Sequence, residues 1–299
     1  MDIGIGLPAA IPWVKPREIL EWARRAERCG FSTLGILDRV VYGNYEAIPT
    51  LAAAAAVTER IGLLTGILIG PARGNGALLA KQLATVDQLS GGRLTVGIAV
   101  GGREDDYTAT EEEFHTRGRA HDQQLAEMRA VWAGESRGLA GAIGPSPAQA
   151  GGPPLLMGGT VDAAIRRTVE HGVGWMGGVG GLDEFKSMVA RVRAAWKEAG
   201  RDGQPRLITG AYFSLGDGGG EDARRYLLDY YAFIPDYMEM IAASALTTAD
   251  QVRETVAAFA DAGCDEFLLV PCSPDPDQVT LLAGAALPAQ QKARDAQAD

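Results

Sequence analysis

Eight short, nearly unbroken apolar runs recur along this chain of 299 residues, and longer amphipathic segments separate them. The runs are DIGIGL (2–7), TLGILD (33–38), GLLTGILIG (62–70), RLTVGIAV (93–100), PLLMG (154–158), GWMGG (174–178), RLITGAYFSL (206–215) and EFLLVP (266–271). Continuous apolar runs are typical of parallel strands that helices cover on both faces. Eight such strands alternating with helices predict a closed (β/α)8 TIM barrel. An open, doubly wound sheet is the alternative, because periodicity alone does not exclude it.

Glycine ends the helical pattern shortly before most of these strands, at Gly30, Gly62, Gly92, Gly172, Gly200 and Gly263. The residue after a helix often adopts a left-handed conformation, which glycine tolerates best. Segment 184–199 places Phe185 and Trp196 on one apolar face at helical spacing. Thr248 and Gln251 have the spacing of a capping box that would open a further helix.

Two of the segments between strands are longer than a single helix requires. Residues 103–153 include a Gly/Pro-rich stretch, and residues 216–247 include a helical pattern that Pro235 interrupts. We interpret both as insertions at the barrel rim, within a single domain that spans residues 1–299.

Composition excludes several classes of function. A net charge of −10 without any basic run argues against nucleic acid as a partner. No apolar run reaches the ~18 residues of a membrane helix, and the N-terminus does not resemble a signal peptide. The three cysteines show no CxxC spacing, and the three histidines lack the spacing of metal ligands. We therefore expect a cytoplasmic protein without a metal site, a membrane partner or a nucleic-acid partner.

Two glycine-rich loops are candidates for phosphate binding. The stretch Gly172–Gly177 fits G-x-G-x-x-G, but it follows a helical segment, whereas a dinucleotide loop follows a strand. In contrast, Gly158, Gly159 and Thr160 follow one predicted strand and Gly177–Gly181 follow the next, each group directly before a helix. Helix N-termini bind anions, and barrels often bind phosphate at this face. We predict one phosphate cup from both loops, with glycine serving turn geometry alone as the alternative.

Asp38 and Arg39 stand at the end of the second predicted strand, on the face where barrel enzymes carry their sites. A charged pair there is a candidate for catalysis, and a structural ion pair is the alternative. The chain has no G-x-S-x-G motif and no evident Cys/His pair. Phosphate loops with few reactive side chains are typical of a barrel whose cofactor carries the chemistry.

Four segments resemble a known family in the right order along the chain. They are GFSTLGILD (30–38), LLAKQLATVDQLSGGRLTVGIAVGG (78–102), FHTRGRAHDQQLAEMRAVWAG (114–134) and PLLMGG (154–159). In combination these motifs resemble the luciferase-like monooxygenase family, the bacterial luciferase-type flavin oxidoreductases. The resemblance covers nearly the whole chain, and no single segment carries it alone.

The resemblance implies a (β/α)8 barrel with FMN, or a deazaflavin such as coenzyme F420, over the C-terminal ends of the strands. The matching cofactor-binding positions are Gly66, Ile67, Leu68, Ile69, Ala99, Val100, Gly101, Gly158, Gly159, Thr160, Gly177 and Gly178. It also implies a homodimer packed through early helices, which here include LAAAAAV (51–57). A cis non-proline peptide is common in the family at the end of strand three, here within Ile67–Gly70.

Two departures from the family pattern narrow the expected activity. Many deazaflavin-dependent members carry histidine after the strand-two aspartate, where this chain has Arg39. The reactive arginine and cysteine of luciferase correspond to Val100 and Ala99, so light emission is not expected.

The leading hypothesis is a monooxygenase that uses O₂ and reduced FMN, supplied by a separate flavin reductase, on a small organic substrate. The alternative is a deazaflavin-dependent reductase or dehydrogenase. A non-catalytic flavin-binding barrel and a lyase acting on a phosphorylated substrate are further alternatives. By location and residue type we assign catalysis to Asp38 and Arg39. The expected substrate contacts are Trp13, Tyr42, Tyr45 and Tyr107.

Overall fold

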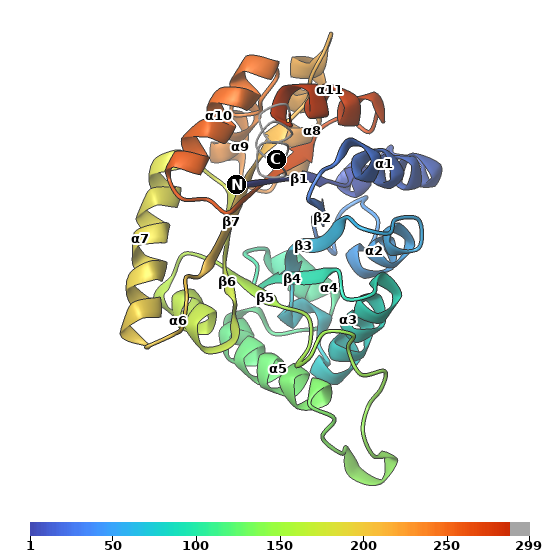
Figure 1. Ribbon diagram of the computed structural model, residues 1–299, viewed down its shortest axis with the longest axis vertical. Coiled ribbons are helices and arrows are strands. Elements are labelled where there is room, and N and C mark those ends of the chain that lie inside the picture. Colours follow the sequence, from blue (N-terminus) through green and yellow to red (C-terminus); the bar gives the residue numbers. More distant parts are fainter. Residues whose placement is uncertain (288–299) are drawn as a thin grey trace, which may run out of the picture.

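The computed structural model describes residues 1–287, in which eight strands close into a barrel (Figure 1). The strands are β1 Asp2–Gly6, β2 Thr33–Ile36, β3 Gly62–Ile69, β4 Leu94–Ala99, β5 Leu155–Gly158, β6 Gly174–Val179, β7 Arg206–Phe213 and β8 Glu266–Pro271. Each strand pairs in parallel with its successor, and β8 pairs in parallel with β1. The predicted TIM barrel is confirmed, and the open-sheet alternative is wrong.

Helices surround the barrel and alternate with the strands (Figure 1). Their bounds are α1 Pro16–Cys29, α2 Ala47–Ala55, α3 Gly76–Ser90, α4 Glu104–Ala109, α5 Arg117–Trp132, α6 Asp162–His171, α7 Leu182–Glu198, α8 Gly219–Tyr230, α9 Pro235–Ala243, α10 Ala249–Asp261 and α11 Asp277–Ala286. Helix α1 ends at Gly30, whose φ of 86° is left-handed. The capping box of Thr248 and Gln251 opens α10 as the sequence predicts.

Glycines inside the strands make room for large side chains in the barrel interior. A Cβ on Gly35 of β2 would lie 2.6 Å from Leu268 Cδ2 of β8, closer than carbon atoms can approach. A Cβ on Gly66 of β3 would lie 2.8 Å from Cε of Met176. Side chains therefore pack the barrel interior beside these glycines.

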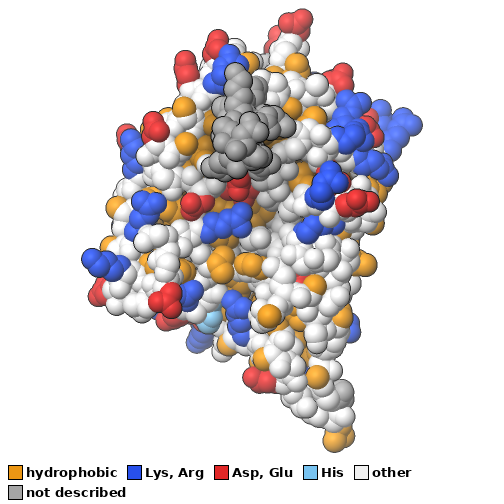
Figure 2. All heavy atoms as spheres, in the orientation of Figure 1, with side chains coloured by type: hydrophobic (Ala, Val, Ile, Leu, Met, Phe, Trp, Pro, Cys, Tyr) orange, Lys and Arg blue, Asp and Glu red, His pale blue; other side chains and the backbone are white. Residues whose placement is uncertain are grey.

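The two segments expected as insertions contain helices and one projecting arm. Residues 103–153 fold into α4 and α5, after which the chain leaves the body as an arm before it returns to β5 (Figures 1 and 2). An antiparallel bridge joins Ser136 to Ala142 within the arm. Residues 216–247 form α8 and α9. The helical conformation is interrupted between them, and Pro235 is the first residue of α9.

Helix α5 buries His121, and we expect this histidine to make the fold sensitive to acid. Its side chain is 1% exposed, and burial, aided by the charge of Arg167, lowers its pKa from 6.5 to about 4. The unfolded chain therefore binds a proton more readily than the folded chain once the pH falls below 6.5. By pH 4 this linkage should cost about 3 kcal/mol of unfolding free energy.

Denaturant unfolding between pH 7.5 and 4 checks this expectation. His121→Gln should flatten the dependence of unfolding free energy on pH, whereas His115→Gln, at an exposed position, should leave it unchanged. Parallel pH curves for the wild type and His121→Gln would show that the buried histidine is not responsible.

Candidate active site

A narrow cavity, here called the central slot, lies at the C-terminal ends of the strands. It has a volume of about 210 Å³. Its walls are Leu37, Asp38, Gly66, Ile67, Met176, Gly177, Gly178, Val179, Gly210, Tyr212, Tyr230, Tyr231, Leu268 and Val270. Aliphatic groups and glycines form most of the slot, and three tyrosines supply its hydroxyl groups. Such a surface suits a flat, largely apolar ring system with a few polar atoms.

A second and smaller cavity of about 70 Å³, the glycine cup, adjoins the slot. Its walls are Thr160, Trp175, Gly177, Gly178, Val179, Gly180, Gly181, Glu184, Phe185 and Thr209. Slot and cup share Gly177, Gly178 and Val179. The two cavities therefore lie side by side along the end of β6.

The glycine cup has the backbone geometry of an anion site. Helix α7 begins at Leu182 after Gly181, so the N–H groups of its first turn lack partners within the helix. At the rim, Arg191 donates hydrogen bonds to the carbonyl oxygen of Thr160 at 2.7 Å and to Asp162 at 2.8 Å. Glu184 adds one carboxylate to the wall. The cup thus combines exposed backbone donors with an arginine close to its edge.

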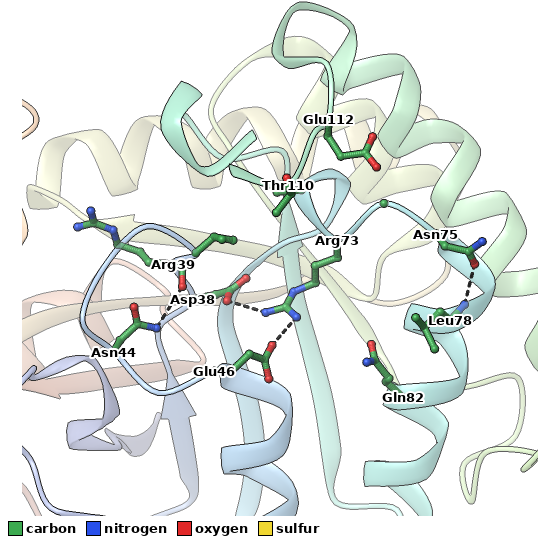
Figure 3. Close-up of a pocket in the computed structure, with 13 residues that line it drawn as sticks. Asp38, Arg39, Asn44, Glu46, Arg73, Asn75, Leu78, Gln82, Thr110 and Glu112 are labelled. Atoms are coloured by element: carbon green, nitrogen blue, oxygen red, sulfur yellow. Dashed lines mark hydrogen bonds and ion pairs between the residues drawn. The ribbon is translucent and has the colours of Figure 1, made fainter. Parts of the chain in front are cut away.

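The largest of the three cavities, here called the polar chamber, lies beyond Asp38 and measures about 640 Å³ (Figure 3). Its walls are Asp38, Arg39, Val40, Asn44, Glu46, Ala72, Arg73, Gly74, Asn75, Leu78, Gln82, Thr110 and Glu112. Asp38 is the residue that it shares with the central slot. The chamber is rich in carboxylate, amide and guanidinium groups, which favours polar ligands.

Asp38 is held by a network that the sequence did not reveal. Its carboxylate accepts a hydrogen bond from the backbone N–H of Ile69 at 2.8 Å and pairs with Arg73 at 2.7 Å. Arg73 also contacts Glu46, so it bridges two carboxylates (Figure 3). The side chain of Asp38 is 1% exposed and that of Arg73 is 15% exposed. This buried pair joins the loop after β2 to the loop after β3.

Arg39 does not pair with Asp38, and its guanidinium points away from it (Figure 3). It donates hydrogen bonds to the carbonyl oxygens of Tyr230 at 2.7 Å and Val41 at 3.0 Å. It also lies 4.4 Å from the ring centre of Tyr42. Arg39 therefore attaches the segment after α8 to the barrel mouth.

The cis peptide bond expected near the end of β3 lies one residue earlier than the expected segment, between Gly66 and Ile67. Both residues line the central slot. A Cβ on Gly158 would lie 2.6 Å from Cδ1 of Ile67, so this glycine makes room for the Ile67 side chain.

The twelve positions expected to bind the cofactor divide into two groups. Gly66, Ile67, Thr160, Gly177 and Gly178 line the slot or the cup. The others lie outside the walls of both cavities and are Leu68, Ile69, Ala99, Val100, Gly101, Gly158 and Gly159.

None of the four expected substrate contacts lines the slot, the cup or the chamber. Trp13 is 41% exposed and lies under the guanidinium of Arg225. Tyr42 hydrogen-bonds to Asp229, and Tyr45 lines an apolar groove beside α1 and α2. Tyr107 is buried and donates a hydrogen bond to the carbonyl oxygen of Val100.

Sequence reasoning missed Arg73, Glu46 and the tyrosines of the slot. Arg73 follows the end of β3 by four residues, so its position near a strand end marks it as a site candidate in the same way as that of Asp38. No comparable sequence signal marks Tyr230 and Tyr231, because their position depends on how the segment after α8 packs on the barrel.

Two features of residues 1–287 concern metal ions and membranes. Within residues 1–287, no three His, Cys, Asp or Glu side chains are arranged to hold a metal ion. No helix in the same range combines the length and apolar character needed to cross a membrane.

The curated relatives of the chain include characterised and uncharacterised proteins. It is 30% identical over 209 residues to an uncharacterised protein of Mycobacterium tuberculosis, covering 60% of this chain and 71% of the relative. It is 30% identical to an FMNH2-dependent dimethylsulfone monooxygenase of Pseudomonas putida, covering 48% and 43% of the two chains. An F420-dependent glucose-6-phosphate dehydrogenase of Beutenbergia cavernae is also 30% identical, with coverage of 44% and 41%.

Solved structures share the fold. The monooxygenase RslO1 from Streptomyces bottropensis superposes with a TM-score of 0.80 at 23% identity and covers 97% of this chain and 100% of that one. An F420-dependent secondary alcohol dehydrogenase gives a TM-score of 0.79 at 20% identity, with coverage of 96% and 99%. The model of the luciferase-like monooxygenase family matches residues 1–280. The chain therefore belongs to the luciferase-like monooxygenase family, whose members are flavin-dependent oxidoreductases.

Proposed function

We propose that the protein is a monooxygenase that uses reduced FMN and O₂ on a small organic substrate. The observation that carries this proposal is that the central slot and the glycine cup adjoin and share Gly177, Gly178 and Val179 in their walls. A ring system joined to a phosphate by a short chain would fill both cavities at once. The FMNH2-dependent relative from Pseudomonas putida supports the choice of cofactor.

The residues present fit such a cofactor. Gly178 is exposed at the junction of slot and cup, and a Cβ built there meets no atom within 4 Å, so the space is open for a ligand. The phosphate would lie against the backbone of Gly178–Gly181 and the first turn of α7. The ring would lie beside Ile67 and the tyrosine wall. When bound, the cofactor would supply electrons and activate O₂ for transfer to the substrate.

The chain itself would bind the substrate and exclude water. We assign the substrate to the polar chamber, because the chamber meets the slot at Asp38 and offers Arg73, Glu46 and Glu112 as polar contacts. Arg73 and Glu46 would orient a substrate group with their charged atoms, and Asp38 would hold Arg73 in place. Arg39 would act through Tyr230 by holding the wall of the slot in place.

A deazaflavin-dependent dehydrogenase is the second candidate. The relative from Beutenbergia cavernae uses F420, and the slot and cup would equally accept that ring and its phosphate. Arg39 counts against this candidate. Its guanidinium donates to carbonyl oxygens and contacts an aromatic ring, so it is not free to donate a proton in the slot.

We further propose that a separate reductase supplies reduced FMN and that the protein is a cytoplasmic homodimer. The three cysteines, Cys29, Cys264 and Cys272, are free thiols, which suits a reducing compartment.

The apolar groove of Pro16, Ile19, Leu20, Tyr45, Pro49, Thr50 and Ala53 is a suitable dimer surface beside α1 and α2. The net charge of −10 and the interspersed charges on the face in Figure 2 support the absence of nucleic acid from its partners.

Titration of the purified protein with FMN, anaerobically reduced FMN and F420 tests the proposal. We expect reduced FMN to bind with a Kd at or below the micromolar range, as measured by calorimetry or fluorescence. Binding of F420 alone would replace the proposal with the second candidate. Failure of all three to bind would contradict both.

A further inference from the structure

Two tyrosine hydroxyls meet at the wall of the central slot. Tyr212 lies on β7, Tyr231 follows the end of α8, and their hydroxyl oxygens are 2.9 Å apart. Both residues line the slot. Tyr212 is fully buried, whereas Tyr231 is half-buried. Tyr231 is therefore the member of the pair that a ligand can reach more easily.

The number of available acceptors decides which of the two hydroxyls donates the hydrogen bond between them. Each hydroxyl has one proton to donate, and a single bond between the two uses only one of these protons. Within residues 1–287, Tyr212 has no hydroxyl partner other than Tyr231. If Tyr231 donated to Tyr212, the proton of the fully buried Tyr212 would lack an acceptor, at a cost in stability. Donation from Tyr212 to Tyr231 avoids this cost and leaves the Tyr231 proton for an acceptor in the slot.

The segment that carries Tyr231 is attached to the barrel on both sides. Arg39 donates to the carbonyl oxygen of Tyr230 at 2.7 Å. The guanidinium of Arg103, from the loop after β4, lies 4.0 Å from the ring centre of Phe233, and this ring stacks on that of Tyr231. The Tyr231 hydroxyl is thus placed by contacts from the loops after β2 and β4.

Both hydroxyls remain protonated near neutral pH. Burial raises the pKa of Tyr212 well above 10, and the neighbouring tyrosines add to this effect. Burial also raises the pKa of Tyr231, although the hydrogen bond from Tyr212 and the charge of Arg39 oppose it and Cys272 reinforces it. Tyr231 can therefore act as a neutral donor throughout the pH range in which the enzyme would work.

We propose that Tyr231 donates a hydrogen bond to a ring oxygen or nitrogen of the cofactor in the central slot, and that Tyr212 fixes the direction of this bond. The inference rests on the proposed function, since it takes the slot to hold the ring. It gives the segment after α8 a specific role in cofactor binding, and it makes Arg39 a positioning residue.

Tyr231→Phe tests the inference because it removes the hydroxyl and keeps the ring. We expect the Kd for reduced FMN to rise about five- to tenfold, the loss of one neutral hydrogen bond. The absorption spectrum of bound oxidised FMN should also shift, which a purely structural role would not produce. Tyr237→Phe, at an exposed tyrosine of α9, is the matched control and should change neither quantity.

Tyr212→Phe is the second variant. It keeps the Tyr231 hydroxyl but removes the hydrogen bond that orients its proton. It should therefore weaken cofactor binding by less than Tyr231→Phe does. Wild-type protein that binds no cofactor would overturn the proposed function itself. Wild-type binding together with an unchanged Kd and spectrum in Tyr231→Phe would overturn this inference alone. A larger effect of Tyr212→Phe than of Tyr231→Phe would also contradict it.

Discussion

Replacing Gly178 with leucine is expected to weaken FMN binding by at least about 100-fold, equivalent to about 2.7 kcal/mol, while the protein stays folded. Gly178 belongs to both the central slot and the glycine cup. A Cβ at this position meets no protein atom within 4 Å, and its φ does not lie in the left-handed region. The β-carbon of the leucine would therefore not strain the fold, and the rest of its side chain would occupy space at the border of slot and cup, where the cofactor is proposed to bind.

The control for this variant is Gly284→Leu. Gly284 is an exposed glycine of α11 whose added Cβ likewise meets no atom within 4 Å, and it lines none of the three cavities. Calorimetric titration should give wild-type affinity for Gly284→Leu and no measurable binding for Gly178→Leu. Equal affinity in both variants would place the cofactor elsewhere.

Replacing Arg73 with methionine should destabilise the protein by about 3–5 kcal/mol, because it leaves a buried carboxylate without its cation. Asp38 would keep the backbone N–H of Ile69 and lose its ion pair. Urea unfolding at pH 7 gives the free energy directly. The double variant Asp38→Asn with Arg73→Met should recover part of the loss, because the buried charge is then absent.

The matched comparison is Arg253→Met, which breaks an exposed ion pair with Asp250. Exposed pairs contribute little, so this change should stay within about 0.5 kcal/mol. If Arg73→Met proved no more destabilising than Arg253→Met, the network around Asp38 would not hold the loops after β2 and β3 together.

The barrel was predictable because its signal is local and repeats eight times. The run 206–215 predicts a strand where β7 extends from Arg206 to Phe213, and the run 33–38 predicts one where β2 extends from Thr33 to Ile36. The stop of α1 at Gly30 and the capping box of α10 are also local, since each depends on residues within one turn of the helix. Gly62 is instead the first residue of β3, and Gly172 is extended.

The partners within the site were not predictable in the same way. Asp38 and Arg39 are adjacent in sequence, but both lie in the loop after β2, where the contacts of each side chain set its direction. The partner of Asp38 is Arg73, which lies 35 residues away and comes close only when the barrel closes. Tyr231 reaches the slot because Arg39 and Arg103 hold its segment, and such long-range packing leaves no periodic pattern in the sequence.

The most direct test of the account is a crystal structure of the protein grown with FMN. We predict the phosphate in the glycine cup, against Gly178–Gly181 and the start of α7, and the ring in the central slot beside Ile67 and Tyr231. A phosphate bound outside the cup, or a ring placed in the polar chamber, would contradict the assignment of slot and cup to the cofactor.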